Sequence, residues 1–184
     1  MIGAAFSVTL ARAQGGDESA FARLFRDIQP ALLRYLRVIT PEAEDVAGET
    51  WLQVVTGLAG FRGSEEAFRA WLFTIARHRA IDAGRSRARR PATSLLDVEE
   101  ITERYLSPDA ADLALDTISA RKVVGLIAKL PRDQAEIIML RVVAGLEPGD
   151  VGRIVGKSAG AVRVASHRGL RRLAELAQRE GVTR

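Results

Sequence analysis

The residues best suited to chemistry lie near the C-terminus, in the stretch SAGAVRVASHRGLRRL at 158–173. Arg163 and His167 stand one helical turn apart, so they share one face of the helix that this stretch predicts. Arginine binds phosphates and the edge of guanine through a planar fork of donors, which makes nucleic acid the ligand that this face fits best. Small residues at 159–161 keep the start of the helix thin, so that its free backbone N–H groups can approach phosphates. The inward face is expected to hold Val162, Ala165, Gly169 and Leu173.

A shorter helix is expected just before this one. The two helices span about 148–155 and 159–179, with a tight turn at Gly156 between them and Ser158 as the cap of the second. This is the layout of a helix-turn-helix, whose second helix enters the major groove of DNA. The alternative is that the arginines at 168–172 form a solvated helix end and only stabilise the helix dipole. The turn between the helices favours DNA binding.

The elements that position this pair are helical along the whole chain. Apolar residues recur at helical spacing, and no alternating stretch of useful length predicts a strand. With 184 residues, 47% of them apolar, the chain can bury two small cores. The predicted fold class is therefore all-α, with two small helical domains at 1–90 and 111–184, joined by a flexible acidic linker at 91–110.

Capping signals and apolar stripes predict the helix boundaries. In the first domain we expect a helix at 8–14, a helix capped by Asp17 or Ser19 with a stripe from Phe21 to Leu36, a helix that starts at Thr40-Pro41 and ends near 58, and a helix at 65–89. In the second domain we expect helices at about 111–130 and 131–144, followed by the pair described above.

Charge is segregated along the sequence. Residues 1–90 carry a net charge of +3, residues 91–120 carry −6 and residues 121–184 carry +7, so two basic blocks flank an acidic one. Of the 27 basic residues 24 are arginine, a bias that suits planar contacts with phosphates and bases. The charge pattern favours a polyanionic partner for both ends of the chain.

Composition excludes several classes of protein. The absence of cysteine rules out disulfides and thiolate metal sites, and the two histidines lack nearby carboxylate pairs, so neither a metal nor another cofactor is expected. No apolar run approaches the ~18 residues of a membrane span, and the N-terminus has no basic leader, so we expect a cytoplasmic protein with no membrane contact.

Four segments, in order, resemble a known family. They are FARLFRDIQPALLRYLRV, AEDVAGETWLQVV, FRGSEEAFRAWLFTIARHRAIDAGRSRARR and LPRDQAEIIMLRVVAGLEPGDVGRIVGKSAGAVRVASHRGLRRL. Together they resemble the two domains of a bacterial extracytoplasmic-function (ECF) RNA polymerase sigma factor of the sigma-70 family. Most of the chain takes part in this resemblance, apart from the extreme termini and the linker.

The resemblance implies a promoter-recognition subunit that binds core RNA polymerase at the β′ clamp and the β flap. The implied contacts with the clamp are Asp45, Glu49, Trp51 and Leu52. Taken alone, Asp45 and Glu49 are also consistent with an exposed helix face, although like charges at this spacing repel by ~0.2–0.5 kcal/mol. The family also implies an anti-sigma factor as a further protein partner. We further expect the acidic linker to enter the polymerase channel, where its negative charge can mimic nucleic acid.

The resemblance further implies that the first domain reads and melts the minus-ten element and the second reads the minus-thirty-five element of promoter DNA. The implied minus-ten contacts are Arg62, Arg77, His78, Arg79 and Arg85. The implied minus-thirty-five contacts are Lys157, Ser158, Ala159, Arg163, Val164, His167, Arg168 and Arg171. Trp71 and Phe73 offer stacking surfaces for melted bases, but helical spacing among Phe68, Leu72 and Ile75 favours the core for Trp71.

Two other functions remain open from the residues alone. The first is a stand-alone helix-turn-helix regulator whose N-terminal domain senses a ligand or dimerises, and tight binding to DNA without polymerase would favour it. The second is a nuclease, which needs a cluster of metal-binding acids. Asp45 and Glu49 are the only pair that invites this interpretation. A sigma factor itself is not an enzyme.

Overall fold

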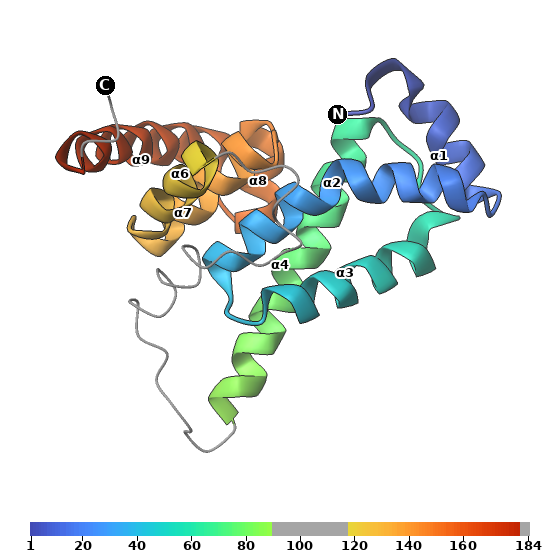
Figure 1. Cartoon of the computed structure of the whole chain (residues 1–184), viewed down its shortest axis with the longest axis horizontal. Coiled ribbons are helices and arrows are strands. Elements are labelled where there is room, and N and C mark those ends of the chain that lie inside the picture. The colour runs from blue at the N-terminus through green and yellow to red at the C-terminus, as the bar shows by residue number, and fades with distance from the viewer. Residues whose placement is uncertain (90–117, 181–184) are drawn as a thin grey trace.

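The structure, a computed structural model, describes residues 1–89 and 118–180. Every regular element in these two ranges is helical, which confirms the predicted all-α fold class (Figure 1). The predicted linker at 91–110 lies outside the described residues, as does the start of the helix expected at 111–130. No helix in the described ranges is long and apolar enough to cross a membrane.

The first half of the chain forms a short 3-10 turn and four α-helices, listed here by their bounds: η1 (Gly3–Ala5), α1 (Phe6–Gln14), α2 (Glu18–Ile39), α3 (Ala43–Leu58) and α4 (Glu65–Arg89). The carboxylate of Asp17 caps α2 by accepting from the backbone N–H groups of Ser19 and Ala20. The sequence predicted that the next helix starts at Thr40-Pro41, but α3 begins after Glu42, so Thr40 is not its N-cap. The Thr40 hydroxyl instead donates to the Glu42 carboxylate at 2.8 Å.

The second half contains five further elements: α6 (Ile118–Ala128), α7 (Arg132–Ile138), the π-helical turn η2 (Met139–Val143), α8 (Pro148–Val155) and α9 (Ala159–Arg179). The single helix expected at 131–144 is therefore divided into α7 and η2. The wider turn brings the Ala144 N–H to the Met139 carbonyl at 2.9 Å, five residues back. By contrast, α8 and α9 have the predicted bounds.

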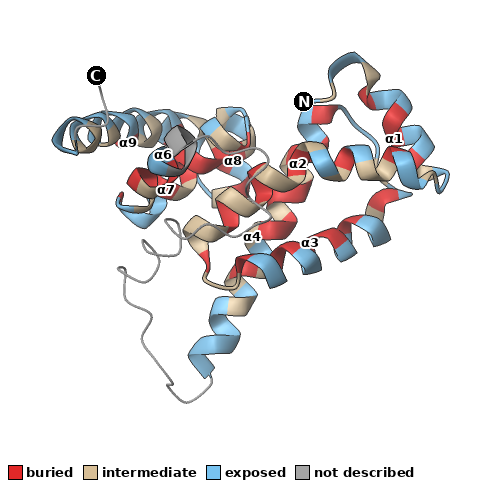
Figure 2. Cartoon of the chain, viewed as in Figure 1, coloured by how far each residue is buried: buried red, intermediate tan, exposed pale blue. Residues whose placement is uncertain are grey.

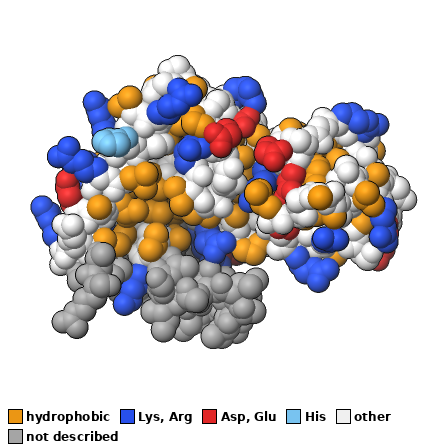
Figure 3. All heavy atoms as spheres, turned by 90° about the horizontal axis from the view of Figure 1, so that it is seen from above, with side chains coloured by type: hydrophobic (Ala, Val, Ile, Leu, Met, Phe, Trp, Pro, Cys, Tyr) orange, Lys and Arg blue, Asp and Glu red, His pale blue; other side chains and the backbone are white. Residues whose placement is uncertain are grey.

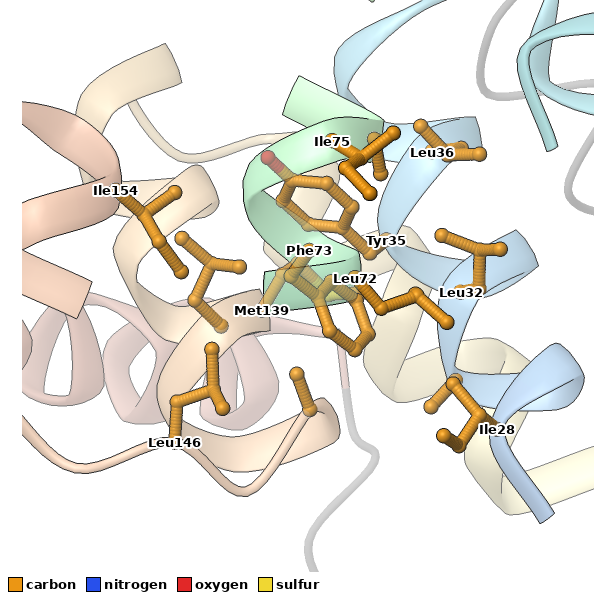
Figure 4. Packing of buried hydrophobic residues seen from close by; sticks show 14 of the residues in the cluster. Ile28, Leu32, Tyr35, Leu36, Leu72, Phe73, Ile75, Met139, Leu146 and Ile154 are labelled. Carbon is orange, nitrogen blue, oxygen red and sulfur yellow. The ribbon is translucent and has the colours of Figure 1, made fainter. Parts of the chain in front are cut away.

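The two halves of the chain share one continuous core. In it, α2 contacts α6, α7 and η2, while α4 contacts α8. We call this junction the seam, and its apolar centre is formed by Tyr35 and Phe73 on one side and Met139, Leu146 and Ile154 on the other (Figure 4). All five side chains are at most 5% exposed. Because these are large apolar groups, their burial gives the seam a strong hydrophobic contribution.

Burial changes along α4, the longest helix described. Phe68, Leu72 and Ala76 are fully buried in its first half, whereas every residue at 84–89 is exposed. Figure 2 shows the last turns of α4 projecting from the core as an exposed rod. The apolar part of the helix thus anchors a basic part that is open to solvent.

Candidate nucleic-acid interface

The helix-turn-helix geometry is built by local signals between α8 and α9. Gly156 ends α8 with φ = 71°, a left-handed conformation that favours glycine. The hydroxyl of Ser158 then caps α9 by accepting from the Ala161 N–H at 3.1 Å. The turn therefore has the predicted glycine and the predicted cap.

A second glycine, which the sequence reasoning missed, is needed for the same turn. A Cβ atom built on Gly152 would lie 2.5 Å from the carbonyl oxygen of Lys157. That distance is far inside van der Waals contact, and the obstacle is backbone rather than a flexible side chain. Only glycine thus lets the end of α8 approach the start of α9 this closely. A glycine four residues before the turn glycine was the available signal.

The inward face of α9 is as predicted. Val162 is fully buried, Gly169 is buried, and Ala165 and Leu173 are partly buried. A Cβ atom on Gly169 would lie 3.0 Å from the Ile138 side chain, so this glycine allows α9 to pack closely on α7. The orientation of α9 is therefore fixed by the second half of the chain.

The residues expected to contact the minus-thirty-five element lie on the outside of α9. Ala159 is partly buried, and the remaining members of that set are exposed, namely Lys157, Ser158, Arg163, Val164, His167, Arg168 and Arg171. Two of them have acidic neighbours: Lys157 lies 3.8 Å from Asp133, and Arg171 lies 3.4 Å from Glu175. The space-filling view in Figure 3 shows basic side chains spread across the whole face that it displays.

Four of the five residues expected to contact the minus-ten element lie on or near the surface of the first half. His78 and Arg85 are exposed on α4, and Arg85 lies 3.4 Å from Asp82. Arg62 is exposed in the loop before α4, where its guanidinium donates to the carbonyls of Ala59 and Phe61. Arg79 is partly buried, and its Nε donates to Gln53 of α3 at 3.0 Å.

Arg77 has a different position from the other four. Its side chain is 24% exposed and lies in the seam, where its Nε donates to Glu136 of α7 at 2.8 Å. Glu136 belongs to the other half of the chain, 59 residues away in sequence. In this arrangement the guanidinium of Arg77 is occupied by a carboxylate instead of facing solvent.

The two aromatic side chains considered for base stacking are placed differently. Phe73 is fully buried in the seam, so it offers no surface to a base. Trp71 is partly buried and stacks on Phe61, with ring centroids 5.2 Å apart. Gly57 makes room for this indole, because a Cβ atom there would lie 2.8 Å from the Trp71 ring. The loop residue Phe61 was not among the predicted site residues.

The outer face of α3 carries three of the four residues expected to contact polymerase. Asp45 and Glu49 are exposed, and Leu52 is 70% exposed. Val55, which was not predicted, is 53% exposed on the same helix. Leu52 and Val55 are three residues apart, so they form a small apolar patch next to the acidic turn.

Trp51 does not lie on this face, and its expected contact with a partner needs correction. The side chain is only 6% exposed, and its indole N–H donates to Gln29 at 2.6 Å. Phe21 and Phe25 pack against the ring, with centroids 5.8 and 4.9 Å away. Trp51 therefore supports α3 from beneath. Helical spacing was the available signal, since Asp45, Glu49 and Leu52 share one face whereas the adjacent Trp51 points in a different direction.

Among the residues that the structure describes, no group of three acidic or histidine side chains could hold a metal ion. Asp45 and Glu49 thus have no third ligand in that part of the chain. The geometry consists of two basic surfaces, on α4 and α9, and one acidic and apolar face on α3. These are surfaces for macromolecular partners.

Comparison with known proteins agrees with this geometry. The family model for Sigma-70 region 2 matches residues 24–90, and that for Sigma-70, region 4 matches residues 120–173. The ECF RNA polymerase sigma factor SigD of Mycobacterium tuberculosis is 37% identical over 182 residues, which cover 94% of this chain and 84% of SigD. The sigma factor ShbA of Streptomyces griseus is 36% identical over 179 residues, which cover 91% and 92% of the two chains.

Solved structures have the same fold. CnrH, in complex with the cytosolic domain of CnrY, matches with a TM-score of 0.60 and 25% identity, covering 95% of this chain and 97% of CnrH. The Bartonella quintana sigma factor RpoE, in complex with the anti-sigma factor NepR, matches with a TM-score of 0.63 and 23% identity, covering 86% and 96%. On its sequence and on the two matched regions, the chain belongs to the ECF RNA polymerase sigma factors of the sigma-70 family.

Proposed function

We propose that this sigma factor reads the minus-thirty-five element of its promoters with α9. The observation that carries this proposal is the start of α9, where small residues and a serine cap leave backbone N–H groups accessible beside exposed Arg163 and His167. Backbone donors at a helix start position the helix on phosphates. Arg163 in the second turn of α9 and His167 in the third then reach base edges, as in other helix-turn-helix proteins.

The minus-ten element is held by the loop before α4 and by the basic face of that helix. Arg62 and His78 contact the melted strand, and Arg85 follows the duplex backbone. Arg77 and Arg79 join this set once their acidic and amide partners are displaced. The stacked pair of Phe61 and Trp71 lies beneath the loop and fixes its shape.

The outer face of α3 binds core RNA polymerase at the β′ clamp, through Asp45, Glu49, Leu52 and Val55. Acidic groups at the rim of the contact add specificity and speed association, while the exposed aliphatic side chains supply buried area. Binding to the β flap comes from the second half of the chain. The protein catalyses nothing itself and works where RNA polymerase works, in the cytoplasm.

A protein partner that keeps the chain inactive is part of this proposal. CnrH and RpoE, whose folds match this chain, were each solved in a complex with another protein, CnrY and NepR respectively. The same faces of α3 and α9 that bind polymerase and DNA would be covered by such an anti-sigma factor.

Run-off transcription with core polymerase tests the proposal. The wild-type chain is expected to direct initiation at specific promoters in a genomic library. Arg163→Ala is expected to lower initiation at those promoters by about tenfold or more, the value of one lost base contact. Arg26→Ala, which removes an exposed charge from α2, serves as the matched control and should leave initiation unchanged. Equal losses in both variants, or tight duplex binding without polymerase, would contradict this reading.

A further inference from the structure

The seam contains a partly buried polar contact that joins the two halves of the chain. Both Arg77 Nε and the Tyr35 hydroxyl donate to Glu136 Oε1, at 2.8 and 3.1 Å. Tyr35 is fully buried, and the Glu136 side chain is 16% exposed. Burial, together with the nearby charge of Glu136, raises the pKa of Tyr35 well above its ordinary value. Tyr35 therefore remains a neutral donor to Glu136 across the physiological range.

A second polar contact crosses the seam at the end of η2. Arg69 is 6% exposed, and its Nε donates to the Ala144 carbonyl at 3.0 Å, while Asp27 lies 3.1 Å from its Nη1. The Ala144 carbonyl follows a π-helical turn, where a carbonyl at a helix end lacks an intrahelical partner. A guanidinium is well suited to that carbonyl, because it also complements the negative end of the helix dipole.

Glu136 competes with DNA for the same donor. A carboxylate and a phosphate both accept from the guanidinium fork of arginine, and Arg77 is one of the proposed minus-ten contacts. A cavity of about 530 Å³ opens beside the pair and is lined by Arg77, Arg132, Asp133 and Glu136. A strand of nucleic acid that reaches this cavity would therefore meet Glu136 as a competitor for the guanidinium of Arg77.

With the seam closed, the chain is also too compact to span the distance between the two promoter elements. A compact chain of this length has a radius of gyration of about 16 Å. Elements centred near −10 and −35 are about 25 base pairs apart, which is about 85 Å of B-form DNA. Both halves cannot hold their proposed elements while Tyr35, Phe73, Met139, Leu146 and Ile154 remain packed together.

We propose that the seam is an autoinhibitory contact, in which Glu136 acts as an internal substitute for phosphate and holds Arg77 until the two halves separate. This inference rests on the proposed role of Arg77 at the minus-ten element. Opening the seam exposes Arg77 and frees the second half to move away. The affinity of the isolated chain for DNA is then reduced by the small fraction of molecules that are open.

The test compares two variants of Glu136 as full-length chains. Glu136→Gln removes the charge but keeps the shape, whereas Glu136→Asp keeps the charge but is too short to reach both Arg77 and Tyr35. Glu18→Gln is the matched control, because it removes one exposed acid from the first turn of α2, away from the proposed DNA contacts. Binding to a fluorescein-labelled 20-nucleotide oligothymidylate is measured by anisotropy, and the radius of gyration by small-angle scattering. Circular dichroism verifies that each variant is folded.

Both Glu136 variants are expected to bind the oligonucleotide about tenfold more tightly than the wild type, the equivalent of one lost charged hydrogen bond in the closed state. Their radius of gyration should increase, whereas the affinity of Glu18→Gln for the oligonucleotide should stay within about twofold of that of the wild type. Adding Arg77→Gln to Glu136→Gln should abolish the gain, because the released donor is then missing.

The proposal is wrong if folded Glu136 variants bind like the wild type, or if Glu18→Gln gives the same gain, since net charge alone would then be the cause. Run-off transcription by the wild-type chain with core polymerase separates this result from a failure of the proposed function. Transcription from promoters with unchanged binding by the Glu136 variants would overturn the autoinhibitory contact alone. Tighter binding by those variants without any promoter-directed transcription would support the contact and overturn the function.

Discussion

Two glycines of α8 are expected to respond in opposite ways to the same substitution. Gly149 and Gly152 lie three residues apart in one helix, and neither has a positive φ. A Cβ atom on Gly149 would meet nothing within 4 Å, whereas one on Gly152 would lie 2.5 Å from the Lys157 carbonyl oxygen. Gly149→Ala therefore gains helix propensity without a clash, while Gly152→Ala must push the turn away from α8.

The magnitudes follow from these distances. Replacing an exposed helical glycine by alanine stabilises a helix by about 0.5–1 kcal/mol. Inserting a methyl group into a closely packed site costs about 1–3 kcal/mol, which exceeds that gain. For a chain of this size, 1 kcal/mol changes the melting temperature by about 2–4 °C. We expect Gly149→Ala to melt slightly above the wild type and Gly152→Ala several degrees below it.

Thermal unfolding followed by circular dichroism measures both changes, and duplex binding by the holoenzyme reports the consequence for α9. Displacement of the turn moves the start of α9 relative to the rest of the motif, so Gly152→Ala should also weaken recognition of the minus-thirty-five element by about tenfold, the value of one base contact. Gly149→Ala should leave recognition intact. If the two variants proved equally stable, the close approach of α8 to the Lys157 carbonyl would be refuted.

Two further predictions concern the first half of the chain. Glu65 is 7% exposed and accepts from the backbone N–H groups of Ile2 and Gly3 at 2.8 and 2.7 Å. Glu65→Ala should therefore lower the free energy of unfolding, measured in urea, by about 2 kcal/mol. Glu66→Ala, next to it and exposed, should lose much less, and equal losses would contradict the argument. Hydrogen bonds from Ser19 and other donors hold the pKa of Asp17 well below its usual range, so the stability it contributes is present at neutral pH and is lost as the pH falls below about 4. Asp17→Asn retains a good helix cap and should show a weaker fall in melting temperature between pH 7 and pH 3; parallel curves would exclude this role.

Local signals explain why much of the fold was predictable. The bounds of α8 and α9 agree with the sequence, because Pro148, Gly156 and Ser158 act on the backbone within a few residues of themselves. The outward and inward faces of α9 follow from helical periodicity for the same reason. Boundary signals of this kind need no knowledge of what else packs against the helix.

Contacts between distant parts of the chain explain what was missed. Tyr35 and Glu136 are 101 residues apart and Glu65 is 63 residues from Ile2, and nothing in either local sequence marks its partner. The burial of Trp51 depends likewise on Phe21 and Phe25 of another helix. The π-helical turn at η2 was missed because the apolar pattern of 131–144 fits one regular helix.

The arginines of this chain illustrate a constraint that a sigma factor with a closed seam must satisfy. A partly buried guanidinium that binds DNA in one state needs a protein partner in the other, since a charge that is withdrawn from water without a partner is costly. Arg77 meets this condition because its partner Glu136 lies in the half of the chain that moves away. Arg69 does not need to change partners fully, since Asp27 lies in its own half, 3.1 Å away, and stays with it after opening. Of these two arginines, only Arg77 loses its charged partner on opening, which is why a conservative change at Glu136 is expected to shift the balance between the closed and open chain.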